Sequence, residues 1–227
     1  MSFEVSKQEG IYLKRFIALV MTVVLTCGGL CASARELFTD VPEDSWAAPY
    51  IYNLADRGIV GGYGDGTFGP WYNVQRCEYA KMLVNIAEVE LVSSTVSPYT
   101  DVPVGEWYFP YVSSAPFITG YVSDGTLFFA PEEPASREDV AVAMVKVLGV
   151  DISKYEDPDG FLAERFSDWE DISAHNRAYI AASVDKGVIT GDQSGTFRAK
   201  DPIIRAEVVA VLYRAFPDEH NVTANPL

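Results

Sequence analysis

The sequence predicts an all-α fold built from three helix-loop-helix repeats around a central helical bundle. A motif that opens with an aromatic residue and places an aspartate two positions later recurs at 38–41, 99–102 and 166–169. Each motif aspartate is followed 36 or 37 residues later by an arginine that begins an apolar segment. These three segments have little polar face, and a helix that is hydrophobic nearly all round is buried. The repetition fixes the architecture and predicts several copies of any site.

The first 34 residues have the pattern of a secretory signal peptide. Lys14 and Arg15 precede the apolar stretch 16–25, and residues 32–34 read Ala-Ser-Ala. A basic region, a short apolar region and such a small-residue site are typical of a cleaved export signal. We predict cleavage after Ala34 and no stable membrane insertion of the remaining chain. The alternative is an uncleaved anchor, but the apolar run is short for a membrane span.

The charge excludes some partners. The chain carries 17 basic and 32 acidic residues, a formal net charge of −15, and the signal holds three of the basic and two of the acidic ones. An acidic protein is repelled by nucleic acid and by anionic membrane surfaces, so neither is expected as a partner. An anionic ligand must therefore be met by a few well-placed cations.

Cysteine usage excludes a disulfide framework. Cleavage of the signal removes Cys27 and Cys31 and leaves Cys77 alone, so no intramolecular disulfide can form. Cys77 lies among the apolar positions of a predicted helix, and we interpret it as a small buried side chain. The alternative is a disulfide between two chains.

The first repeat, 35–90, begins with a helix predicted over 46–57. Ser45 is the predicted N-cap, and Gly58 ends the helix. The next stretch, 61–70, is too rich in glycine for a helix. A second helix is predicted to begin near Arg76.

The other two repeats have the same order of elements. The second repeat, 97–150, has predicted helices over 107–115 and 137–148, with Ser136 and Asp139 placed for a capping box. The third repeat, 164–216, has predicted helices over 175–186 and 205–216. A linker, 151–163, and a C-terminal tail, 217–227, complete the chain. Because only this tail follows the third repeat, we expect either that a cargo partner docks non-covalently or that the module competes for wall sites by itself.

Taken together, these motifs resemble the S-layer homology repeat. The resemblance rests on the opening motif, a Trp-Ala pair at 46–47, the segment GIVGGYGDGTFGP at 58–70 and the arginine-led helix. It extends from about Phe38 to Tyr213. It implies three repeats in a pseudo-threefold arrangement. It also implies grooves between neighbouring repeats that bind a polysaccharide linked to peptidoglycan, often one bearing pyruvyl ketals, on a protein secreted to the bacterial cell wall.

The same resemblance implies that eleven residues line the grooves. They occupy four positions of the repeat: the motif aspartate, a tryptophan at the start of the first helix, a loop glycine and the arginine of the second helix. They are Asp40, Asp101, Asp168, Trp46, Trp107, Gly62, Gly120, Gly191, Arg76, Arg137 and Arg205. The third repeat departs from the pattern, because His175 replaces the tryptophan and Asp192 follows Gly191 where a tyrosine is expected.

These residue types suit an anionic sugar for physical reasons. A pyruvyl ketal carries a fixed carboxylate, and an arginine in the first turn of a helix offers a forked, charged donor beside free backbone N–H groups. Tryptophan offers a flat face to a sugar ring, and glycine lets a ligand approach the backbone. The alternative role for each arginine is an ion pair with the carboxylate two positions on, which is Glu78, Asp139 or Glu207. Packing is an equally good interpretation of the two tryptophans.

The sequence indicates a binding module with no cofactor, no metal and no catalytic residues. His175 and His220 are the two histidines, and no serine or cysteine forms a nucleophile constellation with either. The segments 65–66 and 124–125, both Asp-Gly, lack the alternating oxygen ligands of a calcium loop and are interpreted as turns. The predicted function is non-covalent anchoring to an anionic cell-wall polysaccharide. A self-assembling or adaptor protein that binds another envelope protein is the alternative, and a glycan-active enzyme is less favoured.

Two consequences can be tested by mutation. Replacing Arg76, Arg137 and Arg205 together by alanine is expected to abolish wall binding and to leave helical content intact. Arg205→Ala is expected to cost least of the three single changes, because the third repeat departs furthest from the pattern.

Overall fold

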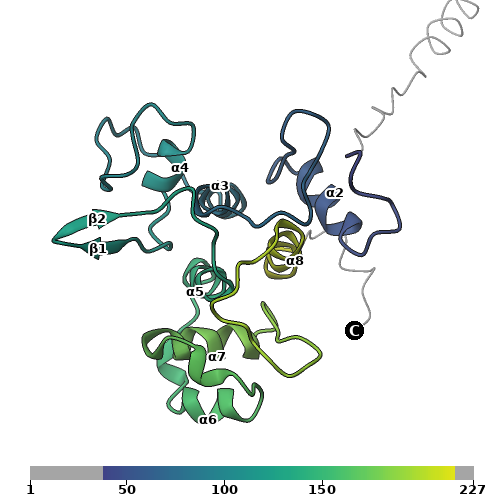
Figure 1. The fold of residues 1–227 in the computed structure, drawn as a ribbon, viewed down its shortest axis with the longest axis vertical. Helices are drawn as coiled ribbons and strands as arrows, with labels where there is room; N and C mark the ends of the chain where they lie inside the picture. The colour runs from purple at the N-terminus through teal and green to yellow at the C-terminus, as the bar shows by residue number, and fades with distance from the viewer. Residues whose placement is uncertain (1–37, 218–227) are drawn as a thin grey trace, which may run out of the picture. The chain divides into compact units, whose positions relative to one another are not determined.

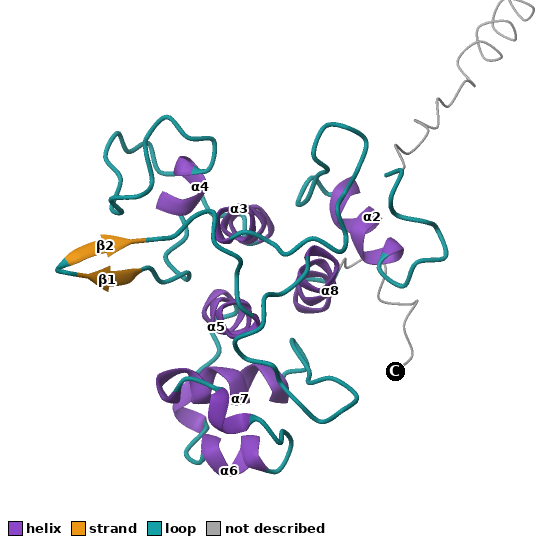
Figure 2. Cartoon of the chain, viewed as in Figure 1, coloured by secondary structure: helices purple, strands orange, loops and turns teal. Residues whose placement is uncertain are grey.

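The computed structural model describes residues 38–217, so the predicted signal peptide and most of the predicted tail lie outside the described residues. The described chain is mostly helical, as predicted, with seven α-helices and one small antiparallel sheet (Figures 1 and 2). None of its helices has the length and apolar character needed to cross a membrane. The helices are α2 (Ala48–Asp56), α3 (Arg76–Ile86), α4 (Phe109–Ser113), α5 (Arg137–Val147), α6 (Pro158–Ala163), α7 (Arg177–Asp185) and α8 (Arg205–Ala215). The strands are β1 (Tyr121–Ser123) and β2 (Thr126–Phe128), and short 3₁₀ turns span Ile152–Lys154, Trp169–Asp171 and Ala174–Asn176.

The three arginine-led helices form the interior. Helix α8 packs against both α3 and α5, and Tyr79 of α3 donates a hydrogen bond of 3.0 Å to the carbonyl oxygen of Val140 in α5. Figure 1 shows these three helices close together, each seen nearly end-on. Most of their side chains are buried, which confirms the expectation drawn from their apolar sequences.

We call the arginine-led helix of each repeat its closing helix. The first helix of each predicted repeat packs against the closing helix of a different repeat. Helix α2 lies on α8, α4 lies on α3, and α7 lies on α5. The repeats therefore interlock, because each supplies one helix to the packing of another.

A closed cycle of backbone hydrogen bonds joins the segments that precede the closing helices. The N–H of Val74 donates to Ile203 at 3.0 Å, that of Ala135 donates to Val74 at 2.9 Å, and that of Ile203 donates to Ala135 at 3.1 Å. Because each arginine follows one of these segments by two residues, the cycle fixes where all three helix starts lie.

Three predicted features need correction, besides shifts of one or two residues at the ends of α2, α4, α5, α7 and α8. Ala47, not Ser45, is the N-cap of α2, because Pro49 suits the first turn and the Ser45 hydroxyl accepts from the N–H of Ala47 instead. The predicted linker contains a helix, α6, in which the Asp157 carboxylate caps the N–H of Gly160. The second repeat contains a β-hairpin that was not predicted, although its Asp-Gly turn was, with both turn residues at positive φ.

Candidate functional site

Each of the three predicted arginines reaches from the first turn of its helix into the glycine loop of another repeat. Arg76 donates from Nε to Phe129 O and from Nη2 to Thr119 O, both at 2.8 Å. Arg205 donates in the same way to Phe68 O and Gly61 O, both at 3.0 Å. Arg137 donates from Nη2 to the carbonyl oxygen of Thr190. All three side chains are buried, at 3–9% exposure.

The third donor of each guanidinium faces a carboxylate on another closing helix. Nη1 of Arg76 lies 3.1 Å from Asp139, Nη1 of Arg205 lies 3.1 Å from Glu78, and Nη1 of Arg137 lies 3.6 Å from Glu207. These are the three carboxylates considered as alternative partners from the sequence. Each pairs with an arginine of a different repeat, not with the one two positions before it.

The three motif aspartates fasten the end of each loop. The two carboxylate oxygens of Asp40 accept from the N–H groups of Phe68 and Gly69 at 2.8 and 2.7 Å. Asp101 and Asp168 hold the equivalent pairs of N–H groups at 129–130 and 197–198. The second residue of each pair has positive φ, at +71° for Gly69, +55° for Ala130 and +58° for Arg198.

The three loop glycines are required by close packing. A Cβ atom on Gly62 would lie 2.3 Å from Thr67 O and 2.8 Å from the ring of Phe38. Gly120 and Gly191 meet the equivalent carbonyl oxygens and the rings of Tyr99 and Phe166. The structure thus gives the glycines, like the aspartates and arginines, a place in the fold whether or not they also touch a ligand.

We call each place where the arginine of one repeat reaches the glycine loop of another a junction. Two grooves lie at such junctions. The Trp107 groove, of about 380 Å³, is lined by residues of all three repeats, including Gly62, Tyr63, Lys81, Trp107 and Arg205. The His175 groove, of about 460 Å³, is lined in the same manner. Its residues include Arg76, Gly120, Tyr121, Asp139, Lys146, His175 and Tyr179.

Each groove also contains a lysine that the sequence did not single out. The Lys81 ammonium lies 5.6 Å from the ring centre of Trp107 and 5.4 Å from that of Tyr111. The Lys146 ammonium lies 5.6 Å from the ring centre of Tyr179 and donates to the Thr119 hydroxyl at 3.0 Å. The sequence indicates these lysines only weakly, because they occupy different turns of α3 and α5 and so do not recur at the same position of the repeat.

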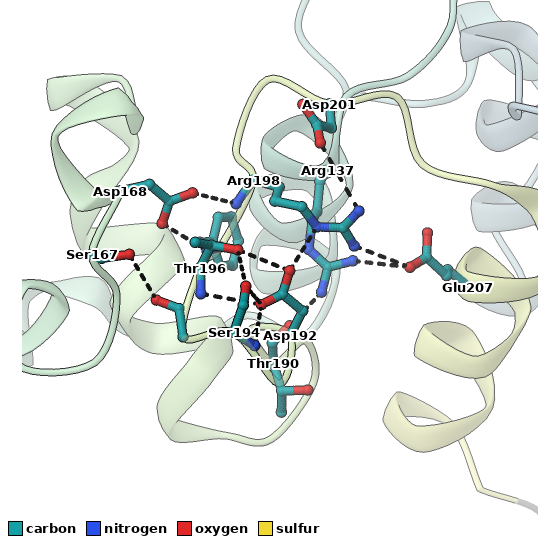
Figure 3. Close-up of polar contacts among 12 residues, drawn as sticks. Arg137, Ser167, Asp168, Thr190, Asp192, Ser194, Thr196, Arg198, Asp201 and Glu207 are labelled. Atoms are coloured by element: carbon teal, nitrogen blue, oxygen red, sulfur yellow. Dashed lines mark hydrogen bonds and ion pairs between the residues drawn. The ribbon is translucent and has the colours of Figure 1, made fainter.

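The third junction is filled by charged side chains of the protein itself. Arg198 lies 3.3 Å from Asp192 and 3.6 Å from Glu207, which also faces Arg137 (Figure 3). Hydrogen bonds from Ser194 and Thr196 hold the pKa of Asp192 well below its usual range, so this carboxylate stays ionised. Burial lowers the pKa of Arg137, and Glu207 opposes that shift. Arg137 and Arg198 are therefore already paired with carboxylates at this junction.

The two tryptophans differ in their surroundings. Trp107 lies in its groove with half of its surface exposed. Trp46 is 48% exposed and packs its ring 6.4 Å from that of Tyr50. Cys77 is buried, as predicted, and burial raises the pKa of its thiol to about 12.

Comparison with known proteins gives one family and several relatives. The model of the S-layer homology domain matches residues 37–80 and 165–209. The chain is 27% identical to S-layer protein sap of Bacillus anthracis over 86% of its own length and 23% of that protein. It is 26% identical to Surface-layer 125 kDa protein of Lysinibacillus sphaericus, over 94% of the chain and 18% of that protein. It is also 26% identical to Amylopullulanase of Thermoanaerobacterium thermosulfurigenes, over 82% of the chain and 10% of that protein. The chain thus spans less than a quarter of the length of these relatives.

Proposed function

We propose that this S-layer homology domain protein anchors non-covalently to the bacterial cell wall by binding an anionic wall polysaccharide in the Trp107 and His175 grooves. The S-layer homology domains place the chain outside the cell, at the wall. The polysaccharide is the peptidoglycan-linked one expected from the sequence, with pyruvyl ketals as its anionic groups. On this proposal the repeats are related by a pseudo-threefold arrangement, which the cyclic bonds among Val74, Ala135 and Ile203 support.

One observation carries the proposal: each groove combines a lysine ammonium, an aromatic face and glycine-loop backbone. In the Trp107 groove, Lys81 lies over the ring of Trp107 beside Gly62. In the His175 groove, Lys146 lies over Tyr179 beside Gly120. An ammonium attracts the ketal carboxylate, and an aromatic ring covers the apolar face of the sugar.

Lysine, not arginine, is the proposed donor to the ligand. The guanidinium groups of Arg76 and Arg205 donate to carbonyl oxygens and pair with Asp139 and Glu78, so their positive charges are largely compensated within the protein. Lys81 is exposed, and its charge is shared with aromatic rings alone in the contacts described above. Of the eleven residues expected from the sequence, five line the two grooves: Trp107, Gly62 and Gly120, which we place at the ligand, and Arg76 and Arg205.

The proposal predicts two binding sites, not three. At the third junction, Arg198 and Arg137 already face the carboxylates of Asp192 and Glu207, so neither guanidinium is free to pair with an incoming carboxylate. Gly191 and Arg137 therefore belong to a junction whose charges the protein pairs itself. We assign Trp46 to the same junction from the cyclic packing of the repeats, in which α2 lies on α8.

The test is co-sedimentation of the purified chain with protein-free cell walls. Binding to intact walls that is lost when the polysaccharide is stripped from the peptidoglycan supports the proposal. Equal binding to stripped and intact walls would identify peptidoglycan itself as the ligand. Self-association without binding to either would favour an assembly or adaptor role. We propose no enzymatic activity, since the match to Amylopullulanase covers a tenth of that protein.

A further inference from the structure

At positions 71–72 the first repeat presents aromatic side chains where the other repeats present charged ones. Trp71 and Tyr72 are 64% and 63% exposed, and Tyr63 is 47% exposed. The positions equivalent to 71–72, counted from the N–H groups that the motif aspartates hold, are Glu-Glu at 132–133 and Lys-Asp at 200–201. Packing of the repeat therefore does not require aromatic residues here, and exposed large aromatics together indicate a contact surface.

Two of these rings form the walls of a third groove. The rings of Tyr63 and Tyr72 lie 6.1 Å apart at an angle of 45°. Gly69 lies between them, where a Cβ would be 2.7 Å from the Tyr72 ring and 2.8 Å from the Tyr63 ring. The groove, of about 400 Å³, also includes Asp65, Thr67 and Asn73, and we call it the Tyr72 groove.

The Tyr72 groove adjoins the Trp107 groove. Tyr63, Gln75 and Glu78 line both, and the Tyr63 hydroxyl donates to Glu78 at 3.1 Å. One polysaccharide chain can therefore occupy both grooves and pass from one to the other beside Tyr63.

The two grooves differ in charge. The residues that line the Tyr72 groove include neither lysine nor arginine. Asp65 lines this groove and not the other, whereas Glu78 lines both and is paired with Arg205. Hydrogen bonds from the Thr67 hydroxyl and N–H lower the pKa of Asp65, which stays ionised and accepts hydrogen bonds. The Asp65 carboxylate repels an anionic sugar. A neutral sugar is suited to this groove, because its hydroxyls can donate to carboxylates and its ring can stack on tyrosine.

We propose that the Tyr72 groove binds a neutral sugar residue of the same polysaccharide whose anionic residue occupies the Trp107 groove. The protein then recognises a sequence of sugars, with a charged residue on the lysine side of Tyr63 and an uncharged one on the carboxylate side. This inference rests on the proposed function for the anionic residue, whereas the neutral contact can be measured by itself.

Calorimetry with three probes tests the inference: wall polysaccharide, the same polysaccharide after mild acid has removed its ketals, and a 4,6-pyruvylated methyl hexoside. Tyr72→Ala is expected to weaken binding of both polysaccharides about tenfold and to leave the hexoside affinity unchanged. Tyr72→Phe should restore binding, because the ring remains. Tyr72 contributes its backbone to the fold and its side chain to the groove, so the variant should stay folded, as thermal unfolding can verify.

Two matched controls distinguish binding in the groove from nonspecific binding to exposed side chains. Trp71→Ala removes an equally exposed aromatic that does not line the groove, and Glu133→Ala changes the equivalent position of the second repeat. Both should bind all probes like the unmodified chain. Loss of affinity in Trp71→Ala equal to that in Tyr72→Ala would overturn the inference and favour a protein-docking patch. Unchanged polysaccharide binding in Tyr72→Ala would overturn it as well.

The proposed function can fail separately. If the hexoside does not bind while the ketal-free polysaccharide binds in a Tyr72-dependent manner, the neutral subsite stands and anionic recognition in the Trp107 groove is wrong.

Discussion

Arg205 pairs with Glu78, 127 residues earlier in the sequence, at 3.1 Å, and this ion pair joins the first turns of α8 and α3. Both side chains are largely buried, at 4% and 12% exposure. The pair links the third predicted repeat to the first, as Arg76–Asp139 links the first to the second. The arginines of the motif are thus part of what holds the repeats together.

Arg205→Ala is therefore expected to destabilise the protein by about 3 kcal/mol or more, because it leaves a buried carboxylate and two carbonyl oxygens without their donor. Urea unfolding followed by circular dichroism measures this loss. Arg214→Ala, an exposed arginine on the same helix, is the control and should change stability by less than about 0.5 kcal/mol.

This expectation revises the one drawn from sequence, in which the triple alanine variant keeps its helical content. The structure predicts that removing all three arginines unfolds the chain. Full helicity and an unchanged midpoint in the triple variant would show that the interlocking ion pairs contribute little to stability.

The left-handed residue after each loop phenylalanine gives a second prediction. Ala130 has φ of +55°, whereas the equivalent residue of the first repeat is Gly69 at +71°. Left-handed backbone costs an L-residue about 1–2 kcal/mol, and part of that is offset by the entropy of glycine in the unfolded chain. Ala130→Gly should therefore raise the free energy of unfolding by about 0.5–1 kcal/mol.

The reciprocal change supplies the control. Gly69→Ala adds both left-handed strain and a Cβ 2.7 Å from the Tyr72 ring, so it should destabilise the protein. Two variants that shift the unfolding midpoint in the same direction would contradict this account of the loops.

Glu138 gives a prediction about pH. Its side chain is buried, which opposes ionisation, but hydrogen bonds from Ser173 N–H, Lys200 and Asn176 outweigh burial and lower its pKa from 4.5. A carboxyl whose pKa is lower in the folded state stabilises the protein above the unfolded pKa. That stability is lost as the pH falls below 4.5 through the folded pKa.

Glu138→Gln should accordingly cost about 2 kcal/mol at pH 7 and progressively less as the pH falls below 4.5. Urea unfolding of both proteins between pH 3 and 7 tests this. A difference in stability that is the same at every pH would mean that the charge of Glu138 is not what holds Ser173 and Lys200.

The sequence was sufficient to predict the helices that carry the motif. Helices α3, α5 and α8 each begin at the predicted arginine, because the arginine follows a short extended segment and precedes a long apolar run. The Ser136–Asp139 capping box is also present, with the Asp139 N–H donating to Ser136 at 3.1 Å. These features are local, so local residue patterns are enough to find them.

The grooves were less predictable because each draws residues from different repeats. The sequence predicts that Asp192 and His175 weaken the site of Arg205, since all three belong to the third repeat. The structure instead places Asp192 at the junction of Arg137, and His175 in the groove of Arg76. Arg205 lines the Trp107 groove. Which residues meet depends on the cyclic pairing of the repeats, and their order in the chain does not reveal it.

This reassignment changes the expected ranking of the sites. Arg137, not Arg205, lies at the junction closed by Arg198, so changes at that junction should affect wall binding least. Lys81→Ala should weaken binding of the wall polysaccharide about tenfold, because it removes the exposed cation over Trp107. Lys146→Ala should weaken it less, because Lys146 already donates to the Thr119 hydroxyl and its groove has His175 in place of a tryptophan.

Lys186→Ala is the matched control for both lysines, since Lys186 lies 3.3 Å from Asp185 on α7, outside the two grooves. It removes the same charge from the chain and should bind like the unmodified protein. Calorimetry at two salt concentrations separates local contact from general charge, because loss of a direct ammonium contact lowers affinity at both while a long-range effect fades at high salt. If Lys186→Ala binds as weakly as Lys81→Ala, net charge and not the groove controls binding, and the assignment of Lys81 as the ligand's cation is wrong.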